Sequence, residues 1–288
     1  AIACDEIYLV DDGNSAVSLP EVPLLGVLPG TGGLTRLVDK RKVRRDRAEV
    51  FSALAEGLEG KSGKEWGLID DSFATSKFQE SVDERVAQIV EADGQPKSVT
   101  GINLNPLQFE STENARDYKY VSLKLHRDKR YVDLTVRAPE SELPTSADEI
   151  QKLGDDYWAL RAYRELDDAL LHLRVNESEI GLVCIRTEGA IENVLAVDKA
   201  LAGNRDNWLV REIILYMSRV LRRLDLTAKS FFSIIEPGSC FAGNLFELVL
   251  ASDRSFMLNN PDEKVEVALS ELNTGAFPMS NGLTRLQS

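Results

Sequence analysis

The chain of 288 residues is poor in the side chains that build metal, redox and disulfide sites. Its three cysteines, Cys4, Cys184 and Cys240, form neither a CxxC pair nor the spacing of a disulfide framework. Its two histidines, His126 and His172, lack the cysteine or carboxylate spacing of a metal site, and neither suits a catalytic triad. We therefore expect no metal and no redox cofactor, and we expect the cysteines to be buried as small apolar residues.

Long apolar runs and an excess of positive charge are also missing. No stretch approaches the length of apolar sequence that a membrane-spanning helix needs, so we expect no membrane insertion. A net charge of -13 opposes bulk attraction to nucleic acid, whose phosphates are bound by many Lys and Arg side chains. A hydrophobic content of 43% is enough to bury globular cores, and the sparse cysteines indicate the reducing cytoplasm.

One local basic run stands out in this acidic chain, at residues 40–47 (Lys-Arg-Lys-Val-Arg-Arg-Asp-Arg). The run is either a solvated helix start or subunit edge, or a contact for the phosphate of an anionic ligand. The glycines at 30–33 leave a similar choice between a phosphate cradle and a tight turn packed against a helix, and packing is the favoured interpretation.

The strongest positive feature is an internal repeat. Leu19-Pro20-Glu21 returns as Leu269-Ser270-Glu271, and Gly33-Leu34-Thr35-Arg36-Leu37 returns as Gly282-Leu283-Thr284-Arg285-Leu286. Residues 3–10 correspond in the same way to residues 251–258. The offset is 248 positions from Asp5 to Asp253 and 249 from Gly33 to Gly282, as expected for a duplicated domain with small insertions.

The phase of the repeat predicts that the chain is a fragment of a longer protein. Residues 238–248 precede Asp253 in the second copy, but no counterpart precedes Asp5. We expect the first copy at residues 1–93, a linker at 94–116 and the second copy at 117–288. In this interpretation the first copy lacks its beginning and the second stops just after its repeated motif.

Strands that alternate with helices predict an α/β fold with mixed sheet pairing. In the first copy we expect a strand at 5–10, a loop rich in Gly and Pro at 18–37, and helices at 47–58, 62–67 with Trp66 buried, and 76–92. In the second copy we expect a hairpin of 118–126 and 131–138, strands at 180–185 and 231–235, a helix around Trp158, and helices at 208–224 and 243–251.

The motifs together resemble the crotonase (enoyl-CoA hydratase/isomerase) superfamily. The resemblance rests on Asp5, Leu19-Pro20-Glu21, Gly26, Pro29-Gly30-Thr31-Gly32-Gly33, Arg36-Leu37 and Gly67-Leu68-Ile69-Asp70. Two copies with a long insert, together with the strings at 24–37 and 235–243, are similar to one branch, the benzoyl-CoA-dihydrodiol lyases or 2,3-epoxybenzoyl-CoA dihydrolases. The fold implied is two tandem crotonase-like (ββα spiral) domains, both incomplete in this chain.

The activity implied by this resemblance is that of a carbon–carbon lyase acting on a CoA thioester. Such an enzyme opens the ring of 2,3-epoxybenzoyl-CoA or its dihydrodiol in aerobic benzoate degradation, giving a didehydroadipyl-CoA semialdehyde and formate. CoA is part of the substrate, so no further cofactor is implied. The resemblance also implies a cytoplasmic homo-oligomer, with a dimer favoured.

The resemblance assigns the site to the first copy. Glu21 matches the family's Pro-Glu carboxylate and would be the catalytic acid or base, although a surface glutamate at a strand end has the same local sequence. Pro20, Gly26, Pro29 and Gly30 would bind substrate. The second carboxylate of the family pair would precede Ala1, so we expect the chain alone to be inactive.

The second copy departs from the family pattern at the positions that would form its pocket. Asn244-Leu245-Phe246 stands where a glycine turn would open to two backbone N–H donors, Ser270 replaces Pro20, and Met279-Ser280-Asn281 replaces Gly30-Thr31-Gly32. Side chains at this turn would obstruct a thioester oxygen, which predicts a scaffold with a degenerate pocket. Two other functions remain open, a hydratase or isomerase on another acyl-CoA and an assembly scaffold without activity.

Overall fold

The computed structural model describes residues 1–288 except 31, 94–100, 141–142 and 260–261, and it divides into two compact units. Unit 1 is Ala1–Val99 and unit 2 is Thr100–Ser288. Each unit combines helices with β-strands, so the predicted α/β class is confirmed. Part of the expected linker, residues 94–100, lies outside the described residues. Its later part was predicted wrongly, because β5 (Glu110–Ser111) and β6 (Ala115–Asp117) are strands of the unit 2 sheet.

Unit 1 contains two short two-stranded sheets and several helices around a small core. Strand β1 (Tyr8–Asp11) runs parallel to β4 (Asp71–Ala74), and β2 (Ala16–Val17) runs antiparallel to β3 (Leu58–Glu59). The helices are α1 (Glu21–Leu25), α2 (Gly33–Thr35), the π-helical turn η1 (Arg36–Lys40), α3 (Arg45–Ala53), α4 (Gly60–Glu65) and α5 (Phe78–Asp93). The core consists of Leu19, Leu37, Val43, Ala48, Phe51 and Leu68.

Several unit 1 elements differ from the sequence prediction. The segment 18–37, predicted as a loop, contains α1 and α2, because Pro20 takes a helical φ of -65° and leads directly into α1. The helix predicted at 47–58 begins at Arg45 and ends at Ala53, since Leu54 has an extended backbone. Trp66 is half-buried rather than buried, and the Arg47 guanidinium lies 5.3 Å from the centre of its ring.

Unit 2 is built on a seven-stranded sheet in the order β11-β10-β9-β8-β7-β6-β5. Strands β8 (Tyr131–Arg137), β9 (Leu182–Glu188), β10 (Ser230–Ile235) and β11 (Arg254–Met257) are parallel, and β5 to β8 pair antiparallel. The predicted hairpin is confirmed, with β7 (Val121–His126) joined to β8 by the short 3₁₀ turn η2 (Arg127–Lys129).

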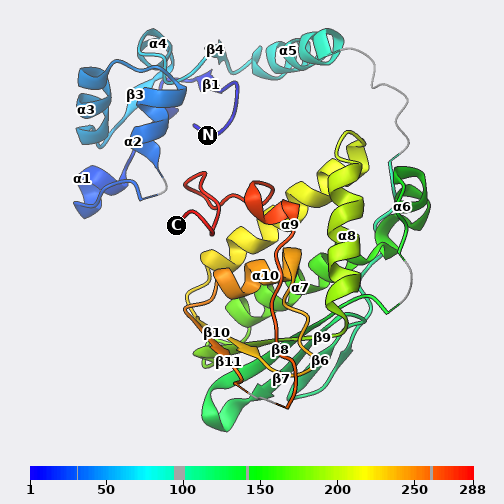
Figure 1. The fold of residues 1–288 in the computed structure, drawn as a ribbon. Helices are drawn as coiled ribbons and strands as arrows, with labels where there is room; N and C mark the ends of the chain where they lie inside the picture. The colour runs from blue at the N-terminus through cyan, green and yellow to red at the C-terminus, as the bar shows by residue number, and fades with distance from the viewer. Residues whose placement is uncertain (31, 94–100, 141–142, 260–261) are drawn as a thin grey trace. The chain divides into compact units, whose positions relative to one another are not determined.

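The long helices α7 (Trp158–Val175), α8 (Ile191–Gly203), α9 (Trp208–Asp225) and α10 (Gly243–Leu250) lie over one face of this sheet (Figure 1). Alternate strand residues such as Leu123, Leu134 and Ile185 are fully buried beneath them. Helices α7, α9 and α10 were predicted, whereas α6 (Ala147–Leu153) and α8 were not. The 3₁₀ elements η3 (Gly154–Asp156) and η4 (Glu271–Thr274) complete the unit.

Candidate active site

Glu21 is the first residue of α1 in unit 1. Pro20 precedes it as the N-cap residue and is exposed, whereas Glu21 is half-buried. Within the described part of the chain, the Glu21 carboxylate makes no hydrogen bond and no ion pair. A half-buried carboxylate that has no protein partner can accept a proton from a bound molecule or donate one to it.

Helix α1 is stopped by Gly26, whose φ of 64° places it in the left-handed region that glycine adopts most readily. The chain then reaches Pro29, which is buried, and turns back so that the Gly32 N–H donates to the Pro29 carbonyl at 3.0 Å. Gly30 is exposed at this turn, and Thr31 lies outside the described residues. The structure therefore places the five site residues predicted in the first copy on one short helix and the turn that follows it.

Gly33 packs this turn against the segment that leads into α1. A Cβ atom at Gly33 would lie 3.0 Å from Pro29 Cβ and 3.3 Å from Leu19 Cδ2. Because Leu19 is two residues before Glu21, this contact couples the position of the turn to that of the carboxylate. At Gly33 the structure thus agrees with the packing interpretation of the glycines.

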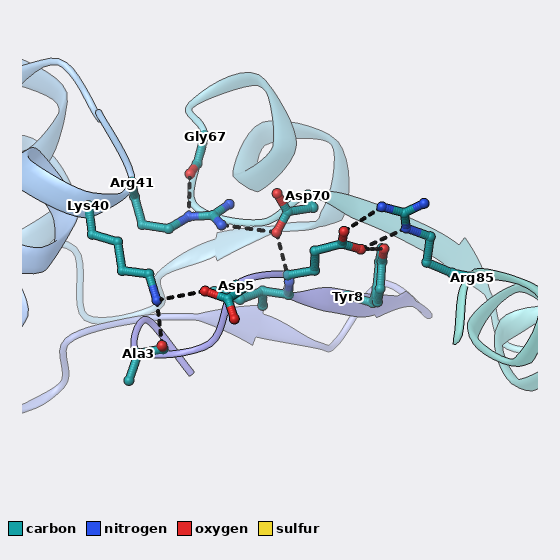
Figure 2. A network of polar contacts seen from close by, with 10 residues as sticks. Ala3, Asp5, Tyr8, Lys40, Arg41, Gly67, Asp70 and Arg85 are labelled. Atoms are coloured by element: carbon teal, nitrogen blue, oxygen red, sulfur yellow. Dashed lines mark hydrogen bonds and ion pairs between the residues drawn. The ribbon is translucent and has the colours of Figure 1, made fainter. Parts of the chain in front are cut away.

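The basic run is largely occupied by ion pairs within unit 1 (Figure 2). Lys40 Nζ lies 3.4 Å from Asp5 Oδ1, and Arg41 Nη1 donates to Asp70 Oδ2 at 3.0 Å. Arg41 Nε also donates to the Gly67 carbonyl at 3.1 Å. Outside the figure, Arg44 pairs with Asp46 at 2.6 Å and Arg47 with Glu65 at 3.5 Å. These contacts favour the structural interpretation of the run over a phosphate site.

A second polar cluster in unit 1 joins β1 to α5. Arg85 forms an ion pair with Glu6 at 2.5 Å, and Tyr8 donates its hydroxyl to the same carboxylate (Figure 2). The hydrogen bonds from Arg85 and Tyr8 lower the pKa of Glu6 to about 2. These three residues line a cavity of about 430 Å³. Because the Glu6 carboxylate is already bound by Arg85 and Tyr8, it is not free to transfer a proton to a molecule in this cavity.

In unit 2 the repeat equivalents of Pro20 and Glu21 have protein partners of their own. Glu271 is exposed and pairs with Arg205 at 3.4 Å. The Ser270 hydroxyl, in place of the proline, donates to Asp198 Oδ2 at 2.5 Å. Asp198 also accepts from the backbone N–H of Asn244 at 2.8 Å, at the start of α10. The sequence indicated Asn244 and Ser270 as departures, but it gave no signal for Asp198.

Glu247, on α10, is held in a buried network. Arg285 Nη1 donates to it at 2.9 Å and Asn273 Nδ2 at 2.8 Å, with the Glu247 side chain 1% exposed. Burial raises the pKa of Glu247, while the hydrogen bonds from Asn273 and Arg285 act in the opposite direction. A carboxylate that is closed off by two donors is poorly placed to exchange protons with a substrate.

The cysteines and histidines do not form a site. Cys240 is buried as expected and its pKa is raised by burial, Cys184 is half-buried, and Cys4 is exposed, contrary to prediction, because it lies in the open segment before β1. His126 Nε2 is 3.0 Å from Asp133, and His172 Nε2 is 3.3 Å from Glu177. Among the described residues, no group of three or more His, Cys, Asp and Glu side chains is arranged to hold a metal ion.

No helix in the described ranges is long and apolar enough to cross a membrane. No family model matches the chain. The chain is 48% identical over 288 residues to a protein named benzoyl-CoA-dihydrodiol lyase from Aromatoleum evansii, and the match covers 100% of this chain and 52% of that protein. The chain therefore spans about half the length of this curated relative. The identity confirms the resemblance to this branch that the motifs indicated.

Similar solved structures share low identity with the chain. Pseudomonas aeruginosa DspI is 14% identical with a TM-score of 0.39, over 61% of this chain and 62% of its own. An enoyl-CoA hydratase/isomerase from Marinobacter aquaeolei is 16% identical with a TM-score of 0.32, over 48% of each chain.

Proposed function

We propose that the protein carrying this chain is a ring-opening lyase that acts on 2,3-epoxybenzoyl-CoA or its dihydrodiol and releases formate and a didehydroadipyl-CoA semialdehyde. The observation that carries this proposal is the identity, along the whole of this chain, to a benzoyl-CoA-dihydrodiol lyase. Because the chain spans only half of that relative, the activity is assigned to the whole protein and not to these residues alone.

The proposed architecture is a pair of tandem crotonase-like domains, with the first copy in unit 1 and the second in unit 2. The internal repeat supports it, since Asp5, Glu21 and Gly33 have counterparts in Asp253, Glu271 and Gly282 in the same order. The division of the structure into two compact units agrees with two domains.

In this proposal Glu21 is the catalytic acid or base. Its carboxylate has no partner among the described residues, and Glu21 is half-buried, so the carboxylate is free to exchange a proton with a bound molecule. Leu24, Leu25 and Leu28 follow within seven residues and are 70%, 72% and 76% exposed. Exposed apolar side chains close in sequence to the carboxylate suit a substrate whose reacting part is an aromatic-derived ring.

Pro20, Gly26, Pro29 and Gly30 bind substrate in this proposal by shaping the backbone around the acyl group. Pro20 fixes the start of α1 and Gly26 its end, and the buried Pro29 anchors the turn that exposes Gly30. Residues without long side chains leave room for close approach of a ligand. CoA enters as part of the substrate, and no separate cofactor is proposed.

Unit 2 acts as a scaffold in this proposal. Its equivalent of Glu21 is paired with Arg205 at the surface, and its Glu247 is closed off by Arg285 and Asn273. The absence of a free acid or base at either position, within the described residues, favours a single active site in the whole protein, to which the first copy contributes. We further propose a cytoplasmic homodimer, as the resemblance to this branch implies.

The substrate assignment is tested with the full-length protein, by measuring formate released from 2,3-epoxybenzoyl-CoA beside hydration of crotonyl-CoA. The proposal predicts stoichiometric formate and negligible hydration. Rapid hydration without formate would support a hydratase acting on other acyl-CoA substrates. Binding of neither ester would support an assembly scaffold.

A further inference from the structure

The first turn of α10 in unit 2 is bound to a carboxylate of the protein itself. Asp198, on α8, is 1% exposed and accepts the Asn244 backbone N–H on Oδ2 at 2.8 Å. The Asn244 side chain donates to Asp198 Oδ1 at 2.5 Å, and the Ser270 hydroxyl donates to Oδ2 at 2.5 Å. Backbone N–H groups at a helix start otherwise bind water or an anion.

The Asp198 carboxylate also explains why residue 243, at this turn, is a glycine. Gly243 has a φ of 46°, and a Cβ atom on it would lie 2.0 Å from Asp198 Oδ2 and 2.9 Å from its Cγ. No side chain fits at that distance. Gly243 therefore allows an anion to lie close to the backbone, and that anion is the carboxylate of Asp198.

We propose that Asp198 is a built-in anion that occupies the N-terminal end of α10 and so prevents a substrate oxyanion from binding in unit 2. The inference deepens the proposed function, because it names the residue that makes the second copy inactive. Thioester oxygens and carboxylates compete for the same donors, since both are stabilised by N–H groups at a helix start.

A second observation points to an anion position here. The Tyr157 hydroxyl is completely buried and has no hydrogen-bond partner among the described residues. Burial raises the pKa of Tyr157, and the negative charge of Asp198 raises it further. A buried hydroxyl without a partner can donate to an anion that comes within hydrogen-bond distance of it.

The test is chemical rescue of the chain by acetate. In Asp198→Ala, a cavity lined by donors replaces the carboxylate, and we expect acetate to raise the urea midpoint relative to chloride at equal ionic strength and pH 7. Asp198→Asn fills the same space and should show no acetate effect. Ser233→Ala, which removes a buried hydroxyl that is bonded to Leu248 and Ser252, is the matched core control.

Should Asp198→Ala fail to fold, Asp198→Ser keeps a small hydrogen-bonding side chain and is read in the same way. An acetate response confined to the Ala or Ser variant supports the proposal. No response, or an equal response in Ser233→Ala, overturns it. Acetate rescue does not depend on turnover, so its failure is distinguishable from failure of the ring-opening assignment.

Discussion

Arg285 and Glu247 form an ion pair in the interior of unit 2, with Arg285 Nη1 2.9 Å from Glu247 Oε2 and the side chains 2% and 1% exposed. Arg285 also donates from Nη2 to Asp225 at 2.6 Å. The arginine thus satisfies carboxylates on α9 and α10 and joins the two helices. Its counterpart in the repeat is Arg36, which is exposed in unit 1.

Removal of this cation should destabilise unit 2 strongly. Arg285→Met leaves Glu247 and Asp225 without their positive partner, and breaking a buried pair from one side costs about 3–5 kcal/mol. Urea unfolding followed by circular dichroism measures the loss. Lys40→Met is the surface control, because Lys40 and Asp5 are 40% and 101% exposed and such a pair contributes about 1 kcal/mol or less. Equal losses in the two variants would contradict the account.

The stability of unit 2 should depend on the protonation of Asp198. Burial raises the pKa of Asp198 from 3.8 to about 6, against the hydrogen bonds from Ser270 and Asn244. The folded state therefore holds this proton more tightly than the unfolded state. The resulting stabilisation is full below pH 3.8 and is lost as pH rises through about 6.

The rise in the pKa of Asp198 from 3.8 to about 6 corresponds to a change in unfolding free energy of about 3 kcal/mol. Urea midpoints of the parent chain and Asp198→Asn, taken from pH 4 to pH 7, isolate the contribution of Asp198. The parent should gain stability relative to the variant as pH falls. A constant difference across this range would show that Asp198 does not titrate there.

Gly243 should be the least replaceable glycine of the α10 turn. Gly238→Ala is its control, since Gly238 also has a positive φ, 83°, but has nothing within 4 Å of a Cβ position. Both substitutions carry the backbone cost of about 1–2 kcal/mol, and Gly243→Ala adds a clash with Asp198 that costs about 1–3 kcal/mol more. The urea midpoints of the two variants test this order. Removing Asp198 in the same chain should erase the extra loss.

The turn next to Glu21 should depend on Gly33 and not on Gly30. Gly33→Ala brings a methyl group to 3.0 Å from Pro29 and 3.3 Å from Leu19, which should cost about 1–3 kcal/mol. Gly30→Ala meets nothing within 4 Å and should stay within about 0.5 kcal/mol of the parent. Thermal unfolding of both variants decides the point, and a larger loss at Gly30 would refute the packing role.

The sequence predicted long, strongly periodic elements well. Helices α7 and α9 each bury one apolar stripe, and the β7–β8 hairpin alternates buried and half-buried or exposed residues. Helix α8 was missed although it buries Val194, Val197 and Leu201 in a helical pattern. The short α1 was missed because it buries no residue and so has no apolar period to detect.

The functional residues likewise differ in whether a local motif or a long-range contact reveals them. Glu21 and the glycine turn were found because their motif is local and repeats in the second copy. Asp198 was not found, because its role follows from contact with Asn244, 46 residues away, and with Ser270, 72 residues away. Such contacts exist only once the sheet has brought α8, α10 and η4 together.

The most direct test of the central claim compares formate release from 2,3-epoxybenzoyl-CoA by the full-length protein and its Glu21→Gln and Glu271→Gln variants. Glu271 is the repeat equivalent of Glu21, so it controls for loss of one carboxylate in the same motif. The account predicts that Glu21→Gln lowers kcat by about 10²–10⁴ with an unchanged circular dichroism spectrum, while Glu271→Gln keeps parental turnover. Parental turnover in Glu21→Gln would contradict the assignment of catalysis to this carboxylate.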